Sequence, residues 1–348
     1  MNNESGIISN VCCGFEIEPC DDLPNQNELT KLKLSSAQKV QISALLRELP
    51  SMTTIGVLAN AYILNLPNGV SVSDLMHYSN GGLGVAYFGE HGIVGHASLQ
   101  SMQSQAVLMG AFNAMSIASG QYFLAEINSN LVAINQKADR ILEFLYGDKK
   151  AELMSEVSFV NFAYKNYNSI MSHEHQKIAT IISLQEARKI AMKDIEFYMS
   201  DLDSLVKAKD VSDLDSFVNK SFQIKDCLQL AIQLYSMSNI LEIYYSQNME
   251  SDYLQYVEKD ILTYIDKCEK RILSNFSAIQ MCIKTFKGNL LKKIDKSVYE
   301  KRVGECVDLL GNGEEFIKRQ PLQSVLQSGL QKPIYYLSKD GEVYLKAV

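Results

Sequence analysis

The clearest arrangement of residues suited to catalysis is a pair of histidines around an acid, His173-Glu174-His175. A zinc-binding helix carries its two histidines four residues apart on one face, in the order H-E-x-x-H. Here the histidines are two residues apart, which places the imidazoles on different faces of a helix. The segment therefore suits a solvent-facing helix start, with Glu174 near the positive end of the helix dipole.

Cysteines near the N-terminus form a second candidate cluster. Cys12, Cys13 and Cys20 supply three sulfurs without a close fourth ligand, and their spacing matches no zinc motif. We assign them no role. The chain has seven cysteines in all, which form no even disulfide framework and suit buried thiols in a reducing cytosol.

A glycine-rich stretch and His96 form the third candidate. The glycines between Gly81 and Gly95 lack the order of a phosphate-binding loop, so bent or closely paired strands explain them better. His96 lies in a region almost without charge, where a hydrogen-bonded structural role competes with that of a base. No nucleophile motif such as G-x-S-x-G accompanies it. We therefore expect no catalytic, metal or cofactor site, and keep an enzyme centred on His96 as the last of three hypotheses.

Composition narrows the range of partners. The chain has 348 residues, 47% of them hydrophobic, which is enough for a large core. A net charge of −7 and a pI near 5.4 argue against nucleic acid as a partner. The first residues lack the basic and apolar runs of a secretory signal, so we expect a cytoplasmic protein.

Residues 55–97 have the alternation and turn chemistry of β-strands, including a hairpin around Gly89-Glu90-His91-Gly92. Between Leu49 and Ala125 the only charged residues are Asp74 and Glu90. A solvent-exposed module of that length normally carries many more charges, so we expect another surface to cover it.

The next stretch, Ser98 to Tyr146, is predicted to be one long helix of about 70 Å. Its second half carries apolar residues in the alternating steps of four and three that are typical of a coiled-coil seam. They are Phe123, Ile127, Leu131, Ile134, Ala138, Ile141 and Leu145.

Long helices with similar seams are expected as far as residue 326, because no proline occurs between Pro67 and Pro321. The tail, residues 334–347, has the pattern of a hairpin around Asp340-Gly341. The predicted fold is mainly α (α+β), an elongated antiparallel helical bundle with a small antiparallel β module. The predicted parts are a flexible arm (1–35), a β-rich module (36–97) joined by residues 333–348, and a bundle (98–326).

The first half of the long helix carries the sharpest functional hypothesis. Ala106, Gly110, Ala114 and Ala118 fall at steps of four, a small-residue ridge that permits close helix contact. Ala106 to Ala125 contains no charge and is long enough to cross a bilayer, although its Asn, Ser and Gln residues make it a poor membrane span. The other interpretation is a central helix buried by its neighbours and the β module.

Long helices with one uncharged segment, Ala106 to Ala125, give the chain a layout that resembles helical pore-forming proteins of the ClyA and haemolysin BL type. The resemblance covers helix lengths and that segment, and no signature motif of those proteins is present. It implies release of the uncharged segment at a membrane.

Our first hypothesis is a non-enzymatic cytosolic protein that acts through protein–protein association, by self-assembly or within a larger complex. The expected interaction residues are the four small residues of the ridge together with Tyr62, Tyr87 and His96. The alternative is a membrane-active effector that uses Ala106 to Ala125.

Overall fold

The computed structural model describes most of the chain and is mainly helical, as predicted. The described residues are 8–10, 15–20, 29–52, 76–77, 83–89, 92–99, 102–141, 147–207, 213–286, 295–313, 316–330, 334–338 and 340–346. The chain forms two compact units, one of residues 1–119 with 331–348 and one of residues 120–330. Each is described by itself below.

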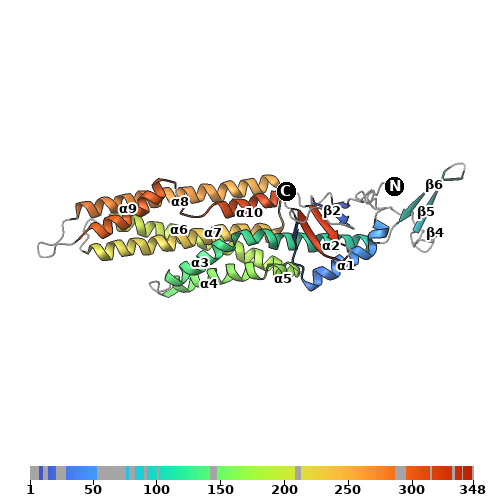
Figure 1. Cartoon of the computed structure of the whole chain (residues 1–348), viewed down its shortest axis with the longest axis horizontal. Coiled ribbons are helices and arrows are strands. Elements are labelled where there is room, and N and C mark those ends of the chain that lie inside the picture. Colours follow the sequence, from blue (N-terminus) through green and yellow to red (C-terminus); the bar gives the residue numbers. More distant parts are fainter. Residues whose placement is uncertain are drawn as a thin grey trace. The chain divides into compact units, whose positions relative to one another are not determined.

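The second unit is a bundle of long helices, which confirms the predicted fold class. In Figure 1, α6, α7 and α8 run side by side, and α6 and α7 make the most extensive contact. The helices are α3 (Asn128–Ile141), α4 (Gly147–Lys165), α5 (Tyr167–Met171), α6 (Glu174–Lys207), α7 (Leu214–Ser246), α8 (Ser251–Thr285), α9 (Ser297–Gly311) and α10 (Gln320–Leu330).

Helix α7 lies at the centre of this unit. Every residue from Leu230 to Tyr245 is buried, which explains why this part of the helix is almost free of charge. Asp213 caps its N-terminus by accepting a hydrogen bond from the backbone N–H of Asp215, at 3.2 Å. Its C-terminal cap, Gln247, has a φ of 55° and stops the helix in the left-handed conformation.

The predicted single helix from Ser98 to Tyr146 is divided in the structure. Ser98 belongs to a strand, and helix α2 (Met102–Leu124) begins four residues later. A 3₁₀ turn, η4 (Ala125–Ile127), separates α2 from α3, and residues 142–146 lie outside the described residues. The turn comes where the uncharged segment ends and the charged seam begins, and Ile127 is still buried within it.

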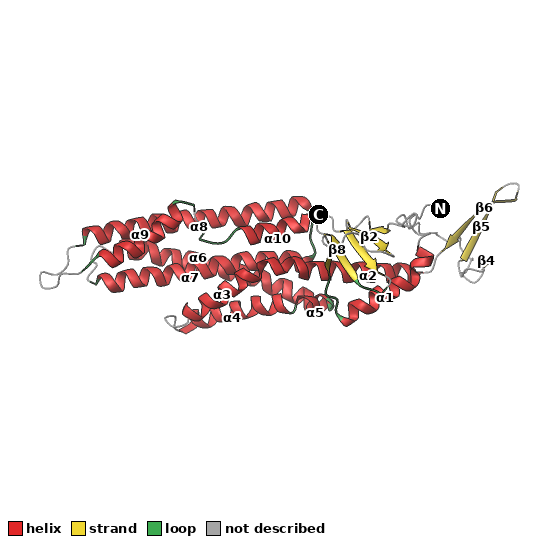
Figure 2. Ribbon diagram, viewed as in Figure 1, coloured by secondary structure: helices red, strands yellow, loops and turns green. Residues whose placement is uncertain are grey.

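The first unit contains a five-stranded sheet in the order β1-β2-β7-β8-β3 (Figure 2). The strands are β1 (Ile8–Asn10), β2 (Phe15–Cys20), β3 (Leu29–Lys31), β7 (Ile334–Ser338) and β8 (Val343–Lys346). The β7–β8 hairpin is present as predicted, and Gly341 has the positive φ, 78°, that its turn requires.

The strand partners of this hairpin differ from the prediction. We expected the tail to join the sheet of residues 55–97, but β7 pairs with β2 in parallel and β8 pairs with β3 in antiparallel. Two of the three N-terminal strands therefore cover both edges of the hairpin. Residues 1–35, predicted to be an arm, contribute all three of these strands.

The second sheet, β4-β5-β6, is antiparallel and consists of β4 (Met76–His77), β5 (Leu83–Gly89) and β6 (Gly92–Leu99). The β5–β6 hairpin confirms the prediction made from its glycines. Met76 and His77 of β4 pair with Gly84 and Leu83 of β5.

Helix α1 (Ser36–Met52) begins one residue after its cap. The Ser35 hydroxyl accepts a hydrogen bond from the backbone N–H of Gln38, and the Gln38 side chain accepts one from the backbone N–H of Ser35. This reciprocal pair is a capping box. Pro50 lies inside the last turn of α1.

Gly120 on α2 provides a test of the packing in the second unit. A Cβ at this position would overlap the Tyr167 hydroxyl and lie 3.0 Å from Cζ of the same ring. That hydroxyl donates to the backbone carbonyl of Tyr244, at 3.1 Å, so it is held in place. We expect Gly120→Ala to lower the free energy of unfolding in urea by about 1–3 kcal/mol.

Gly110 is the matched control, because a Cβ there meets the Gln41 side chain at an ordinary 3.7 Å. Gly110→Ala should raise the free energy of unfolding by about 0.5–1 kcal/mol, the usual gain from Gly to Ala within a helix. Equal effects of the two substitutions would contradict the packing described here.

Candidate functional site

The four small residues of the predicted ridge all lie on α2, and the described ones are largely covered by the chain itself. Ala114 and Ala118 are 0% and 2% exposed. Gly110 is half-buried next to Gln41 of α1, and the side chain of Ala106 lies outside the description. Ala114 and Ala118 are therefore covered in the folded chain and are not free for a partner.

A polar contact fixes the end of this buried stretch. Ser119 donates to the backbone carbonyl of Met115, at 2.9 Å, and its hydroxyl lies 2.5 Å from the hydroxyl of Tyr335 on β7. Both side chains are buried. A serine is tolerated here because the helix backbone and the sheet satisfy its hydrogen bonds.

Of the other three residues predicted for the interaction surface, the structure describes two, His96 and Tyr87. His96 lies on β6 opposite Ala86, and Tyr87 lies on β5 opposite Gly95. Tyr62 is outside the described residues. The association prediction for these residues stays a prediction.

The His173-Glu174-His175 segment forms an exposed helix start, as expected. Glu174 is the first residue of α6, and all three side chains are exposed. His173 is hydrogen-bonded through Nδ1 to the backbone carbonyl of Ser169, at 2.9 Å.

A cluster of ionisable residues joins α4 to α6. It was not identified in the sequence analysis. Lys149 Nζ lies 2.6 Å from Glu152 and 2.5 Å from Asp194, whose side chain is only 2% exposed. Burial opposes the charge on Lys149, but the hydrogen bonds to Asp194 and Glu152 raise its pKa. Lys149, Glu152 and Glu156 are spaced three and four residues apart, a signal that places them on one helix face.

Glu156 is the unusual member of this cluster. Its Oε2 atom is buried, and no described group hydrogen-bonds to it. Burial raises the pKa of Glu156 to about 7, and the negative charges of Glu152, Asp194 and Glu186 add to the shift. We therefore expect Glu156 to be largely neutral below that pH, and its ionisation to oppose the contact between α4 and α6.

A second polar group joins α6 to α7. Arg188 donates to Glu242 at 2.8 Å and to Asn239 at 3.1 Å, and Gln185 donates to the other oxygen of Glu242 at 2.8 Å. Each charge is paired and hydrogen-bonded, which is what a largely buried carboxylate needs. The arrangement is that of a structural tie between helices.

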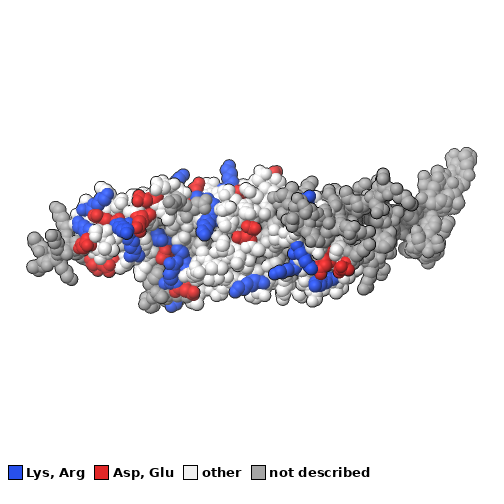
Figure 3. Space-filling model, viewed as in Figure 1, with Lys and Arg blue, Asp and Glu red and all other residues white. Residues whose placement is uncertain are grey.

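Two further properties of the described residues bear on other functions. No group of three or more His, Cys, Asp or Glu side chains within them is arranged to hold a metal ion. Nor does any helix within them combine the length and apolarity needed to cross a membrane. On the face shown in Figure 3, acidic and basic side chains are intermingled over the helical unit.

Comparison with known proteins assigns the chain to no family. The chain matches no protein-family model, and neither a curated protein nor a solved structure is significantly similar to it.

The raised pKa of Glu156 predicts a pH-dependent stability. A carboxyl whose pKa is higher in the folded state stabilises the fold fully below about pH 4.5, and that contribution is lost as the pH rises toward 7. Glu156→Gln keeps the neutral shape at every pH. Relative to the unsubstituted protein, it should gain about 1–2 kcal/mol in free energy of unfolding between pH 5 and pH 8.

The measurement is urea unfolding at the two pH values, with Glu305→Gln as the control. Glu305 is exposed on α9, so its substitution should change stability equally at both pH values. An effect of Glu156→Gln that is also independent of pH would show that Glu156 titrates normally.

Proposed function

We propose that this is a non-enzymatic, cytoplasmic helical-bundle protein that acts through protein–protein association, as a self-assembling protein or as a subunit of a larger complex. The bundle of long helices supports the proposal, and the four cysteines of the helical unit, Cys227, Cys268, Cys282 and Cys306, are free thiols. Free thiols are typical of a reducing compartment.

One surface carries the proposal. The outer side of α4, which we call the α4 face, exposes five uncharged residues at helical spacing: Ala151, Met154, Ser155, Ser158 and Phe162. Met154 and Phe162 are 43% and 52% exposed. By contrast, the neighbouring helix α6 exposes an ion pair, Glu186 with Lys189, whose side chains are 63% and 70% exposed.

Single exposed apolar residues are ordinary on soluble proteins. An exposed helix face that carries no charged residue over three turns is unusual. Phe162 and Met154 are already about half-buried, so covering the rest of each would contribute roughly 0.7–1.5 kcal/mol. Aromatic residues such as Phe162 are frequent anchors of protein interfaces. Since Ala114 and Ala118 are buried, we place association on the α4 face rather than on the ridge.

The test is the molar mass in solution, measured by size-exclusion chromatography with light scattering from low to high micromolar concentration. We expect a mass above the 39.0 kDa of one chain, or co-purification of a second protein in fixed proportion. Phe162→Glu should weaken that association more than tenfold, because it places a charge at a desolvated contact.

Val298→Glu is the matched control, since Val298 is 66% exposed on α9, away from the α4 face. It should leave the mass unchanged. A strictly monomeric protein that carries no partner from its native source would overturn the proposal. Equal effects of both substitutions would exclude the α4 face as the contact.

A further inference from the structure

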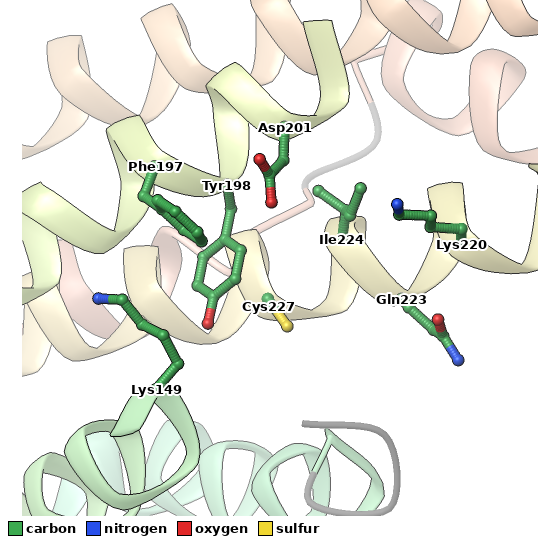
Figure 4. A pocket seen from close by; sticks show the side chains of 8 residues that line it. All are labelled: Lys149, Phe197, Tyr198, Asp201, Lys220, Gln223, Ile224 and Cys227. Atoms are coloured by element: carbon green, nitrogen blue, oxygen red, sulfur yellow. The ribbon is translucent and has the colours of Figure 1, made fainter. Parts of the chain in front are cut away.

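A cavity of about 260 Å³ lies between α4, α6 and α7 in the helical unit (Figure 4). Its walls come from three segments that are far apart in the sequence. The lining residues are Lys149, Phe197, Tyr198, Asp201, Lys220, Gln223, Ile224 and Cys227. The cavity is large enough to hold a small organic molecule.

Two aromatic rings give the cavity its shape. The rings of Phe197 and Tyr198 have their centroids 5.2 Å apart and meet at 74°, so they form a corner of two nearly perpendicular faces. Ile224 and Cys227 on α7 supply further apolar lining. Phe197 is 45% exposed, whereas Tyr198 is 4% exposed. A flat aromatic ring fits such a corner, stacking on one ring and meeting the other edge-on.

The hydroxyl of Tyr198 supplies the polar feature. It is buried, and no nitrogen or oxygen atom among the described residues hydrogen-bonds to it. Its hydrogen-bonding neighbour is the thiol of Cys227, a weak partner. Figure 4 shows this hydroxyl in the space between Lys149 and Cys227. A buried hydroxyl without a strong partner is costly, and a bound acceptor would remove that cost.

The charges around the cavity disfavour an anion. Lys149 is already paired with Glu152 and Asp194, and both carboxylates act on the Tyr198 hydroxyl. The other two charged residues of the lining, Asp201 and Lys220, have opposite signs. A carboxylate placed beside Tyr198 would thus meet two acids and one cation that is already neutralised.

We propose that this cavity binds a neutral, single-ring aromatic molecule that carries a hydrogen-bond acceptor, with a phenol as the simplest example. The ring packs in the corner between Phe197 and Tyr198, and the Tyr198 hydroxyl donates to the oxygen of the ligand. The proposal is independent of protein association.

Three probes of similar shape separate the contributions of the aromatic ring, the hydrogen-bond acceptor and a negative charge to binding. They are toluene, 4-methylphenol and 4-methylbenzoate. Binding to the full chain is measured from the chemical-shift changes of the protein on titration. We expect 4-methylphenol to bind about fivefold more tightly than toluene, the difference that one neutral hydrogen bond makes. We expect 4-methylbenzoate to bind more weakly than either.

Two variants locate the binding. Tyr198→Phe keeps the ring, so it should retain toluene binding, abolish the preference for 4-methylphenol and leave the melting temperature unchanged or higher. Phe197→Ala should weaken all ring-bearing probes, and Met192→Ala is its control. Met192 is 40% exposed on the same helix and does not line the cavity, so its substitution should have no effect.

Three results would overturn the proposal. The first is the absence of binding by 4-methylphenol at millimolar concentration. The second is an unchanged preference for 4-methylphenol in Tyr198→Phe. The third is tighter binding of 4-methylbenzoate than of 4-methylphenol.

Discussion

The helical unit depends on the complete burial of α7 between Leu230 and Tyr245. Burial of these turns on every side leaves their polar groups without water, so hydrogen bonds to α7 itself or to neighbouring helices must replace those to water. Tyr235 donates to Asp260 on α8, Tyr244 to the carbonyl of Val325 on α10, and Tyr245 to the carbonyl of Ala163 on α4. The hydroxyls of these tyrosines thereby align three helices along α7.

The same constraint explains where the charges of the bundle lie. A carboxylate on α7 is tolerated at Glu242 because Arg188 and Gln185 reach it from α6. Outside the buried stretch, α6 and α8 use exposed or half-exposed pairs such as Arg271 with Asp203, at 2.7 Å, which contribute little to stability. The apolar contacts of α7 carry the stability of the unit, and the ion pairs align the helices around it.

Local sequence signals predicted the long helices and the β7–β8 hairpin, because heptad seams and the Asp340-Gly341 turn act within a few residues. They did not predict the parallel pairing of β2 with β7, since that contact joins residues more than 300 positions apart and β2 itself is partly acidic. The cavity was missed for a similar reason. Lys149, Tyr198 and Cys227 come from three helices, and each alone has the pattern of an ordinary helical residue.

Helix α4 carries part of each feature that we connect with function. Its inner side places Lys149 at the cavity and Glu156 against α6, and its outer side is the α4 face. The helix is held by the Lys149–Asp194 pair, by the bond from Tyr245 to the Ala163 carbonyl, and by buried Leu153 and Val160. Ionisation of Glu156 adds a repulsive charge beside Glu152 and Asp194, on the same helix side as the Lys149 pair. Glu156, the Lys149 pair and the α4 face thus share one helix, so the charges on its inner side and the apolar contacts on its outer side depend on the same backbone.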